Sequence, residues 1–259
     1  YTLEAAVDEH DIVKYDGSTL AIAPSRSSCC FVVDGFPLSA DEAVQAPATS
    51  ESQIKLFTTD VDAGTASQVG SILLPEGIAT EGLYLNGTSM QALLSTSWWG
   101  SFGDRFLDPF SWQEQTVKLQ SYDIANAGSP DLISELSIEG GLVTSRRTAG
   151  EVHLITRHAP NIDGLVPYPR TALEIENNVA ILSDASESDV LPEISIDGVS
   201  VEPFSLDDCY RADDKHPLAA DLPADSVLTT LLTVSSATGE ILRSACIMEP
   251  IGGIYVSDD

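Results

Sequence analysis

Short apolar runs separated by turn residues dominate the chain. Runs of about four to eight residues, rich in Val, Ile, Leu, Thr and Tyr, alternate with Gly, Asp, Asn, Ser and Pro, which is typical of strands and turns. We find no convincing stretch with the i, i+3, i+4, i+7 spacing of a surface helix. We therefore expect an all-β protein with strands at residues 11–14, 19–23, 31–33, 53–58, 69–74, 82–85, 90–95, 116–123, 132–138, 142–146, 152–157, 227–234, 240–248 and 253–256.

These runs recur in a fixed order of strand, polar turn, strand, short link, strand, Gly turn and strand. Three units share this order: residues 53–95, 116–156 and 228–256. Gly17, Gly87 and Gly150 are expected at equivalent tight turns. A repeat of four short antiparallel strands is the unit of a β-propeller blade. The expected fold is therefore β-propeller-like, with about three four-stranded antiparallel blades, the first strand of a fourth, and long inter-strand insertions.

We interpret residues 1–259 as a single partial β-propeller domain. Residues 158–226 form its largest insertion, rich in Pro and acidic residues, which we expect as excursion loops with a short hairpin at residues 193–202. Residues 97–113 form a second, aromatic-rich excursion loop. Because a ring usually needs at least four blades, we expect a protein partner or self-association to complete the propeller.

Two segments carry a resemblance to a known family. VDEHDIVKYDG at residues 7–17 and the stretch at residues 122–156 resemble secreted bacterial and archaeal proteins with a β-propeller domain distantly related to WD40 repeats. The chain departs from that pattern at His10, at Tyr15 and in the turn at 125–128, which leaves the fold expectation intact. The resemblance implies an extracytoplasmic location, no established chemistry, and a chain that corresponds to the N-terminal portion of a longer propeller.

The charge of the chain excludes some partners. Twelve Lys and Arg against 40 Asp and Glu give a net charge of −28. No basic stripe is available to neutralise phosphates, so nucleic acid is not an expected partner. No run of about 18 apolar residues could span a membrane. The acidity is typical of a solvated surface kept soluble by like charge, and a cation site or a basic partner is the alternative.

Four cysteines, Cys29, Cys30, Cys209 and Cys246, allow three full pairings, among which the sequence does not choose. The cysteines could be four buried thiols or could include one structural disulfide; both interpretations stand, since the redox state of the cellular compartment decides between them. We favour a bridge between Cys209 and Cys246.

Acidic residues offer two candidate calcium sites. Asp60, Asp62 and Gly64 begin like a calcium-binding loop, but Ser71 stands where the loop needs Glu, so an Asx turn explains them better. A looser candidate lies in the insertion: Asp207, Asp208, Asp213, Asp214 and Asp221. No cofactor is expected with certainty, and calcium is the candidate.

Six aromatic residues gather in the second excursion: Trp98, Trp99, Phe102, Phe106, Phe110 and Trp112. Two interpretations remain for these residues. The loop packs on the blades and buries them, or they form an exposed anchor for a protein or carbohydrate partner. The four histidines (His10, His153, His158 and His216) have no nameable catalytic partner, and no G-x-S-x-G motif is present.

The sequence therefore favours an extracytoplasmic binding or scaffold module without evident catalytic machinery. The alternative is an extracellular hydrolase that uses carboxylates on propeller-face loops, with or without calcium. Two or three acids that converge at one end of the central channel with raised pKa values would favour the enzyme.

Overall fold

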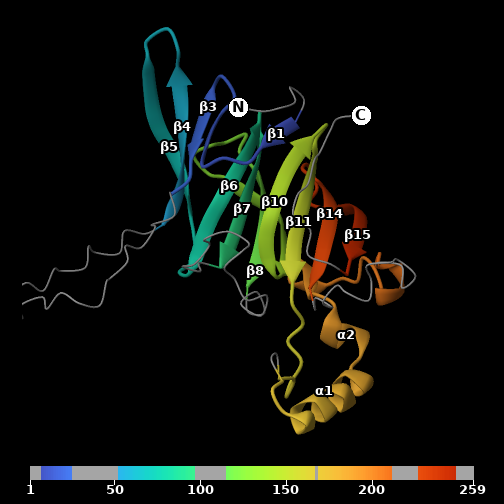
Figure 1. The fold of residues 1–259 in the computed structure, drawn as a ribbon. Coiled ribbons are helices and arrows are strands. Elements are labelled where there is room, and N and C mark those ends of the chain that lie inside the picture. The colour runs from blue at the N-terminus through green and yellow to red at the C-terminus, as the bar shows by residue number, and fades with distance from the viewer. Residues whose placement is uncertain (1–6, 25–51, 97–114, 167–168, 212–226, 249–259) are drawn as a thin grey trace, which may run out of the picture.

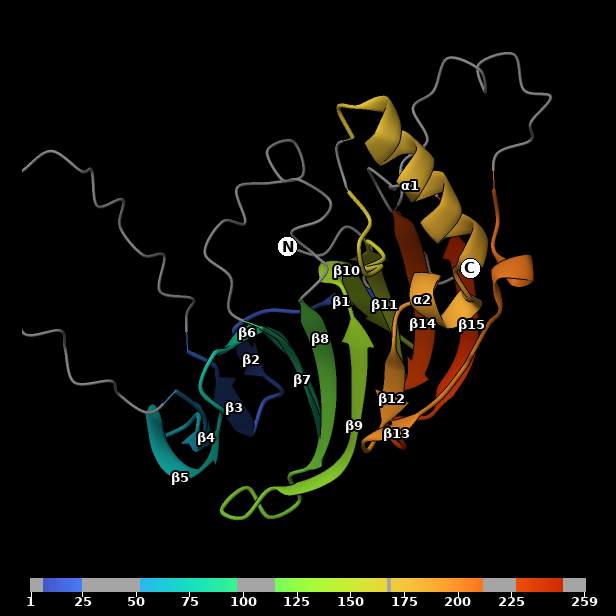
Figure 2. The same ribbon diagram turned by 90° about the horizontal axis from the view of Figure 1, so that it is seen from below.

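Three antiparallel sheets stand side by side in the computed structural model, which describes residues 7–24, 52–96, 115–166, 169–211 and 227–248 (Figure 1; Figure 2). The first contains β2 (Val13–Tyr15), β3 (Thr19–Ile22), β4 (Gln53–Asp60) and β5 (Thr65–Leu73). The second contains β6 (Ile78–Asn86), β7 (Ser89–Thr96), β8 (Thr116–Asp123) and β9 (Asp131–Glu139). The third contains β10 (Gly141–Thr148), β11 (Glu151–His158), β14 (Leu228–Ser235) and β15 (Ile241–Ile247).

Each group of four strands pairs in chain order, as a propeller blade does. The expectation of an all-β, propeller-like fold with three four-stranded blades is thus confirmed. The expected strands at 31–33 and 253–256 lie outside the described residues. The repeated sequence unit is out of step with the blades, since it runs from the third strand of one blade to the second strand of the next.

Glycines close the turn between the first and second strand of every blade. Gly17, Gly87 and Gly150 all have positive φ, at +102°, +58° and +83°. L-residues with a Cβ avoid this region, whereas glycine enters it freely. The expected equivalence of these three turns is confirmed.

Two seams of buried side chains join the three blades. The first seam, between the first and second blades, is built around Leu56, Leu83 and Leu94. The second seam, between the second and third blades, is built around Tyr84, Leu93 and Leu154. Side chains alternate across each strand, so the second blade sends Leu83 into one seam and Tyr84 into the other.

The N-terminal strand ties the inner strands of the blades together. β1 (Val7–Glu9) pairs antiparallel with β10 on the inner edge of the third blade. The chain then bridges Asp11 to Leu83 of β6 and enters β2 of the first blade. One short segment therefore contacts all three blades at the centre of the arc.

The insertion after β11 is more ordered than the sequence indicated. It contains α1 (Ala172–Asp184), α2 (Glu187–Val190), β12 (Ile194–Ile196), β13 (Val199–Ser200) and the short helix η2 (Leu206–Asp208). The expected hairpin at 193–202 is confirmed as β12–β13. It pairs with β9 and lengthens the second blade to six strands.

The expectation of no helix was wrong for α1. Thr171 caps this helix through a reciprocal capping box with Glu174, and this T-x-x-E signal is legible in the sequence. The apolar spacing of Ile175, Val179 and Leu182 fits a helix, but these side chains are exposed and contribute no buried face. Among the described helices, none is long and apolar enough to cross a membrane.

Candidate binding pocket

A pocket opens where the insertion spans the outer edges of the second and third blades. We call it the wedge pocket; its volume is about 590 Å³. The β12–β13 hairpin attaches one wall to the second blade through β9. Tyr210 attaches the other wall to the third blade by backbone hydrogen bonds of 2.8 Å with Cys246 and Met248. The pocket therefore lies on the outer side of the second seam, away from the central junction, the region at the centre of the arc where residues 7–15 contact all three blades.

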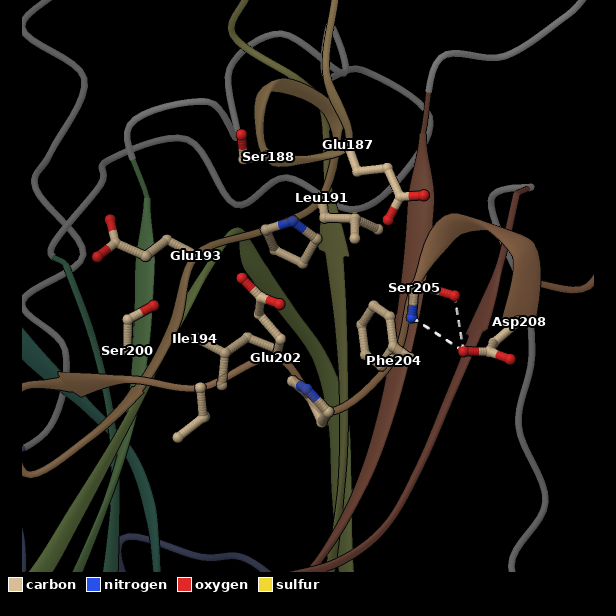
Figure 3. A pocket seen from close by; sticks show the side chains of 13 residues that line it. Glu187, Ser188, Leu191, Glu193, Ile194, Ser200, Glu202, Phe204, Ser205 and Asp208 are labelled. Atoms are coloured by element: carbon tan, nitrogen blue, oxygen red, sulfur yellow. Dashed lines mark hydrogen bonds between the residues drawn. The ribbon is translucent and has the colours of Figure 1, made fainter.

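Apolar side chains and acidic side chains divide the lining of the wedge pocket. Pro192 and Ile194 are buried, whereas Phe204 is half-buried. Four carboxylates join them: Glu187, Glu193, Glu202 and Asp208. In Figure 3, Glu187 extends toward the side of Phe204 and Ser205, where its carboxylate accepts from the Leu206 amide at 3.5 Å, and Glu202 lies near Ile194; Glu193 and Asp208 lie on opposite sides of the pocket. Leu191, Val201, Pro203, Ser188, Ser200 and Ser205 complete the lining.

Among the described residues of the lining there is no Lys, Arg or His. The carboxylate of Asp208 accepts hydrogen bonds from the Ser205 amide (3.0 Å) and hydroxyl (2.8 Å), and these bonds lower its pKa. The wedge pocket thus combines an apolar floor with an anionic rim. Such a surface complements a cation that carries an apolar stem.

A disulfide holds the wall that contains η2. The structure joins Cys209 to Cys246 of β15, with the two Cα atoms 4.7 Å apart, and this is the pair favoured from the sequence. Both cysteines are buried with Leu228, against Leu191 and Phe204. The bridge therefore fixes the segment before Cys209 to the third blade. Cys29 and Cys30 lie outside the described residues.

The opposite wall rests on two neighbouring titratable groups, the half-buried Glu139 and the buried His158. The Glu193 amide donates to the Glu139 carboxylate at 3.2 Å, and the two backbones also bond at 2.9 Å. Burial raises the pKa of Glu139, and the nearby charge of Glu193 adds to this. Nδ1 of His158 lies 3.9 Å from the Glu139 carboxylate.

His158 is 2% exposed. Burial lowers the pKa of His158 to about 4, partly offset by the Val190 backbone. Within the described part of the chain, neither ring nitrogen makes a well-formed hydrogen bond.

The aspartates proposed as calcium ligands form no metal site among the described residues. Asp208 is engaged with Ser205, and in the described ranges no group of three or more His, Cys, Asp or Glu could hold a metal ion. Asp213, Asp214 and Asp221 lie outside those ranges. Asp60 accepts from the Ala63 amide at 2.9 Å in the β4–β5 turn, which is the Asx turn expected there.

Two of the histidines belong to hydrogen-bond networks of the blades. The Ser145 hydroxyl bridges the Tyr84 hydroxyl (2.7 Å) and Nδ1 of His10 (2.9 Å) at the central junction. Tyr84 and Ser145 are fully buried, so this Ser–His pair is closed to substrates. His153 lies between Thr148 and Thr233 at 2.8 and 3.2 Å, a satisfied strand residue as expected. His216 is not in the described part.

The wedge pocket was not anticipated from the sequence. The six aromatic residues proposed for binding (Trp98, Trp99, Phe102, Phe106, Phe110 and Trp112) lie outside the described residues and stay a prediction. A signal was nevertheless present. The two segments that flank the predicted hairpin, Leu191–Glu193 and Val201–Phe204, each place Pro beside Glu, and both line the pocket.

Comparison with known proteins agrees with this architecture. The family model described as a β-propeller domain matches residues 2–259. The chain belongs to this β-propeller domain family. Searches of curated proteins and of solved structures found no match. As a propeller, the molecule has an architecture suited to protein interaction, whereas its chemistry must be argued from its own sites.

The hydrolase alternative requires two or three acids with raised pKa values at one end of the central channel. Glu139 has a raised pKa, but it ends the fourth strand of the second blade, on the outer side of the propeller. The predicted convergence of two or three such acids at the central channel therefore gains no support from Glu139.

Proposed function

We propose that this β-propeller is an extracytoplasmic binding module whose wedge pocket accepts a positively charged side chain of a partner protein. The observation that carries the proposal is the lining of the pocket: four carboxylates surround an apolar floor, and the lining residues that the structure describes include no basic one. A Lys or Arg side chain would lay its alkyl stem against Phe204 and Pro192 and extend its charge to the rim.

The geometry favours a side chain over a free ion. The four carboxylates are spread around the pocket: Glu187 and Asp208 lie on the side of Ser205, and Glu193 lies on the opposite side (Figure 3). A guanidinium or ammonium group with several donors satisfies carboxylates spread in this way. Anchoring of both walls to blades keeps the pocket formed before binding, which reduces the entropic cost of association.

Two features support a location outside the cytoplasm. The buried Cys209–Cys246 disulfide is of a kind that persists in oxidising compartments. The net charge of −28 suits a protein outside the cell whose like surface charges keep it soluble. Fractionation of the producing cells tests this part: recovery of the protein with fully reduced Cys209 and Cys246 from the cytosol would overturn it.

Peptide binding tests the pocket. The probes are a fluorescent peptide of alternating arginine and leucine, and the same peptide with glutamate in place of arginine. We expect the arginine peptide to bind and E187Q/E202Q to weaken its binding about tenfold, because this variant removes two of the four carboxylates of the lining.

The matched control is E76Q/D163N, which removes two exposed carboxylates outside the pocket lining. Equal weakening by both double variants would show that the net charge, and not the pocket, attracts the peptide. Equal binding of the glutamate peptide would also overturn the proposal.

A further inference from the structure

The β12–β13 hairpin leaves a strand edge of the second blade beside the wedge pocket. In the order of that sheet β13 is the last strand, and it pairs with β12 alone among the described strands. The Val201 amide donates to the Ile194 carbonyl at 2.8 Å, so the backbone of Val201 faces β12. Because successive residues of a strand direct their amide and carbonyl groups to opposite sides, those of Ser200 face away from β12.

The outward-facing backbone continues for two residues beyond Ser200. Pro203 follows Glu202, and a residue before proline favours extended backbone, so the amide and carbonyl of Glu202 are expected to face the same way as those of Ser200. Both residues are exposed, and no other described segment forms a backbone hydrogen bond with either. We call the outward backbone groups of Ser200 and Glu202 the β13 edge. Such an edge is a template for a further strand.

The chain itself adds strands to both blades that flank the wedge pocket. On the second blade, β12 pairs with β9, the fourth strand of the blade. On the third blade, Tyr210 bridges to Ile247 of β15 and is held by hydrogen bonds with Cys246 and Met248. The outer edge of the third blade is therefore occupied at Tyr210, whereas the β13 edge is free among the described residues. A further strand beside the pocket would pair with the β13 edge.

The lining of the wedge pocket determines which strand fits. Ser200 and Glu202 both contribute to that lining. In an antiparallel pair, a residue directly opposite either of them has its side chain on the same face of the sheet, and thus beside the pocket. The four carboxylates of the lining favour a Lys or Arg at that position. In strand addition of this kind, backbone pairing supplies affinity and the pocket supplies specificity.

We propose that the partner segment is an extended strand that pairs antiparallel with the β13 edge and places a basic side chain in the wedge pocket. This inference rests on the proposed function of the pocket and adds the backbone conformation of the partner. An antiparallel direction matches the pairing of β12 with both of its neighbours and is the more stable one per residue. Residues between the basic positions of the partner direct their side chains to the opposite face, so the pocket does not select them.

Hydrogen exchange of single backbone amides tests the strand, with the alternating arginine and leucine peptide as the probe. In the free protein the Ser200 and Glu202 amides should exchange fast, and saturation with the peptide should slow them at least about tenfold. The Val201 amide, bonded to Ile194, is the internal control and should exchange slowly in both states. Binding without protection of Ser200 and Glu202 would overturn this inference alone, because the pocket would then take a side chain without a strand. Slow exchange at Ser200 in the free protein would overturn it too, because the edge would already be covered.

Methylation of the peptide backbone tests the direction of the strand. In an antiparallel pair, the arginine opposite Ser200 directs its own amide toward β13, and the neighbouring leucines direct theirs to solvent. Methyl groups on two central arginine amides should therefore weaken binding at least about tenfold, whereas methyl groups on two central leucine amides should leave it nearly unchanged. Equal binding of both methylated peptides, or weakening by the leucine version alone, would overturn the antiparallel strand. Failure of the unmodified peptide to bind would overturn the proposed function, and this inference with it.

Discussion

The two seams of the propeller arc are closed by different means. In the described residues, side chains of the strands and adjoining turns fill the first seam. The second seam has such a core too, but the insertion adds a hairpin on one blade, backbone bonds to the other and a disulfide. The wedge pocket lies on the outer side of this second seam. The same kind of blade packing can therefore form a seam without a pocket or a seam with a binding site, depending on what the connecting segment adds.

The central junction acts on both seams alike. Asp8 of β1 forms ion pairs with Lys14 of the first blade (2.7 Å) and Arg147 of the third (2.8 Å). The Arg147 guanidinium also lies 5.5 Å from the ring centre of Tyr84 on the second blade. Because all three blades share this network, differences between the seams should arise mainly from the insertion.

The largest expected effect comes from the disulfide of the second seam. C209S/C246S opens a loop with a sequence separation of 37 residues, for which the chain-entropy model gives about 4 kcal/mol of lost stability. Denaturant unfolding without reductant measures it. The serine pair isolates this bridge, because a reductant is not selective for one pair of cysteines. An unchanged unfolding midpoint would show that the insertion is held by packing alone.

A smaller difference in stability is expected between substitutions in the two segments that link one blade to the next. Gly140 joins the second blade to the third with φ +118°, and a Cβ there would lie 2.3 Å from the Arg157 carbonyl oxygen. Gly77 joins the first blade to the second with φ +78° and has no atom within 4 Å of a Cβ. We expect G140A to cost about 3 kcal/mol, from backbone strain and crowding, and G77A about 1 kcal/mol from strain alone. Equal midpoints in thermal unfolding would mean that the close approach at Gly140 is relieved.

The pH dependence of stability should also point to the second seam. His158 has a folded-state pKa of about 4 against 6.5 in its ordinary state. The contribution of the neutral His158 to the free energy of unfolding is complete above pH 6.5. It is lost as the pH falls toward 4, because the unfolded chain binds the proton at higher pH than the folded chain does. The shift corresponds to about 3 kcal/mol.

Chemical unfolding at a series of pH values tests this expectation, with H158Q as the comparison. The difference in unfolding free energy between wild type and H158Q should fall between pH 6.5 and 4 and be flat above this range. H153Q serves as a second comparison: burial lowers the pKa of His153 as well, but this ring is only half-buried and is hydrogen-bonded by Thr148 and Thr233, so its pH-dependent difference should be smaller. A pH-independent difference for H158Q would show that His158 is already solvated.

The blades were predictable from the sequence because their information is local. Alternating apolar residues mark strands such as β11, and glycines with positive φ mark the turns at Gly87 and Gly150. The wedge pocket was not predictable, because its walls come together only when the insertion reaches across two blades. The helix α1 is an intermediate case. Its capping box at Thr171 is a local signal that the sequence contains. The helix buries no apolar face, however, so it lacks the packed amphipathic stripe on which helix prediction usually depends.

The smallest expected effect compares two buried tyrosines of the second blade that face different seams. The Tyr84 hydroxyl bonds across the second seam to Ser145 at 2.7 Å, whereas the Tyr122 hydroxyl bonds to Gln120 of its own strand at 2.7 Å. Y84F should cost about 1 kcal/mol, because Ser145 stays buried on another blade with one partner fewer. Y122F should cost less, about 0.5 kcal/mol, because Gln120 also reaches Glu135. Thermal unfolding of both variants gives the comparison. If Y122F proves the more costly, the hydroxyl within the blade matters more than the one between blades, and the second seam is held by its apolar core and insertion without help from the central junction.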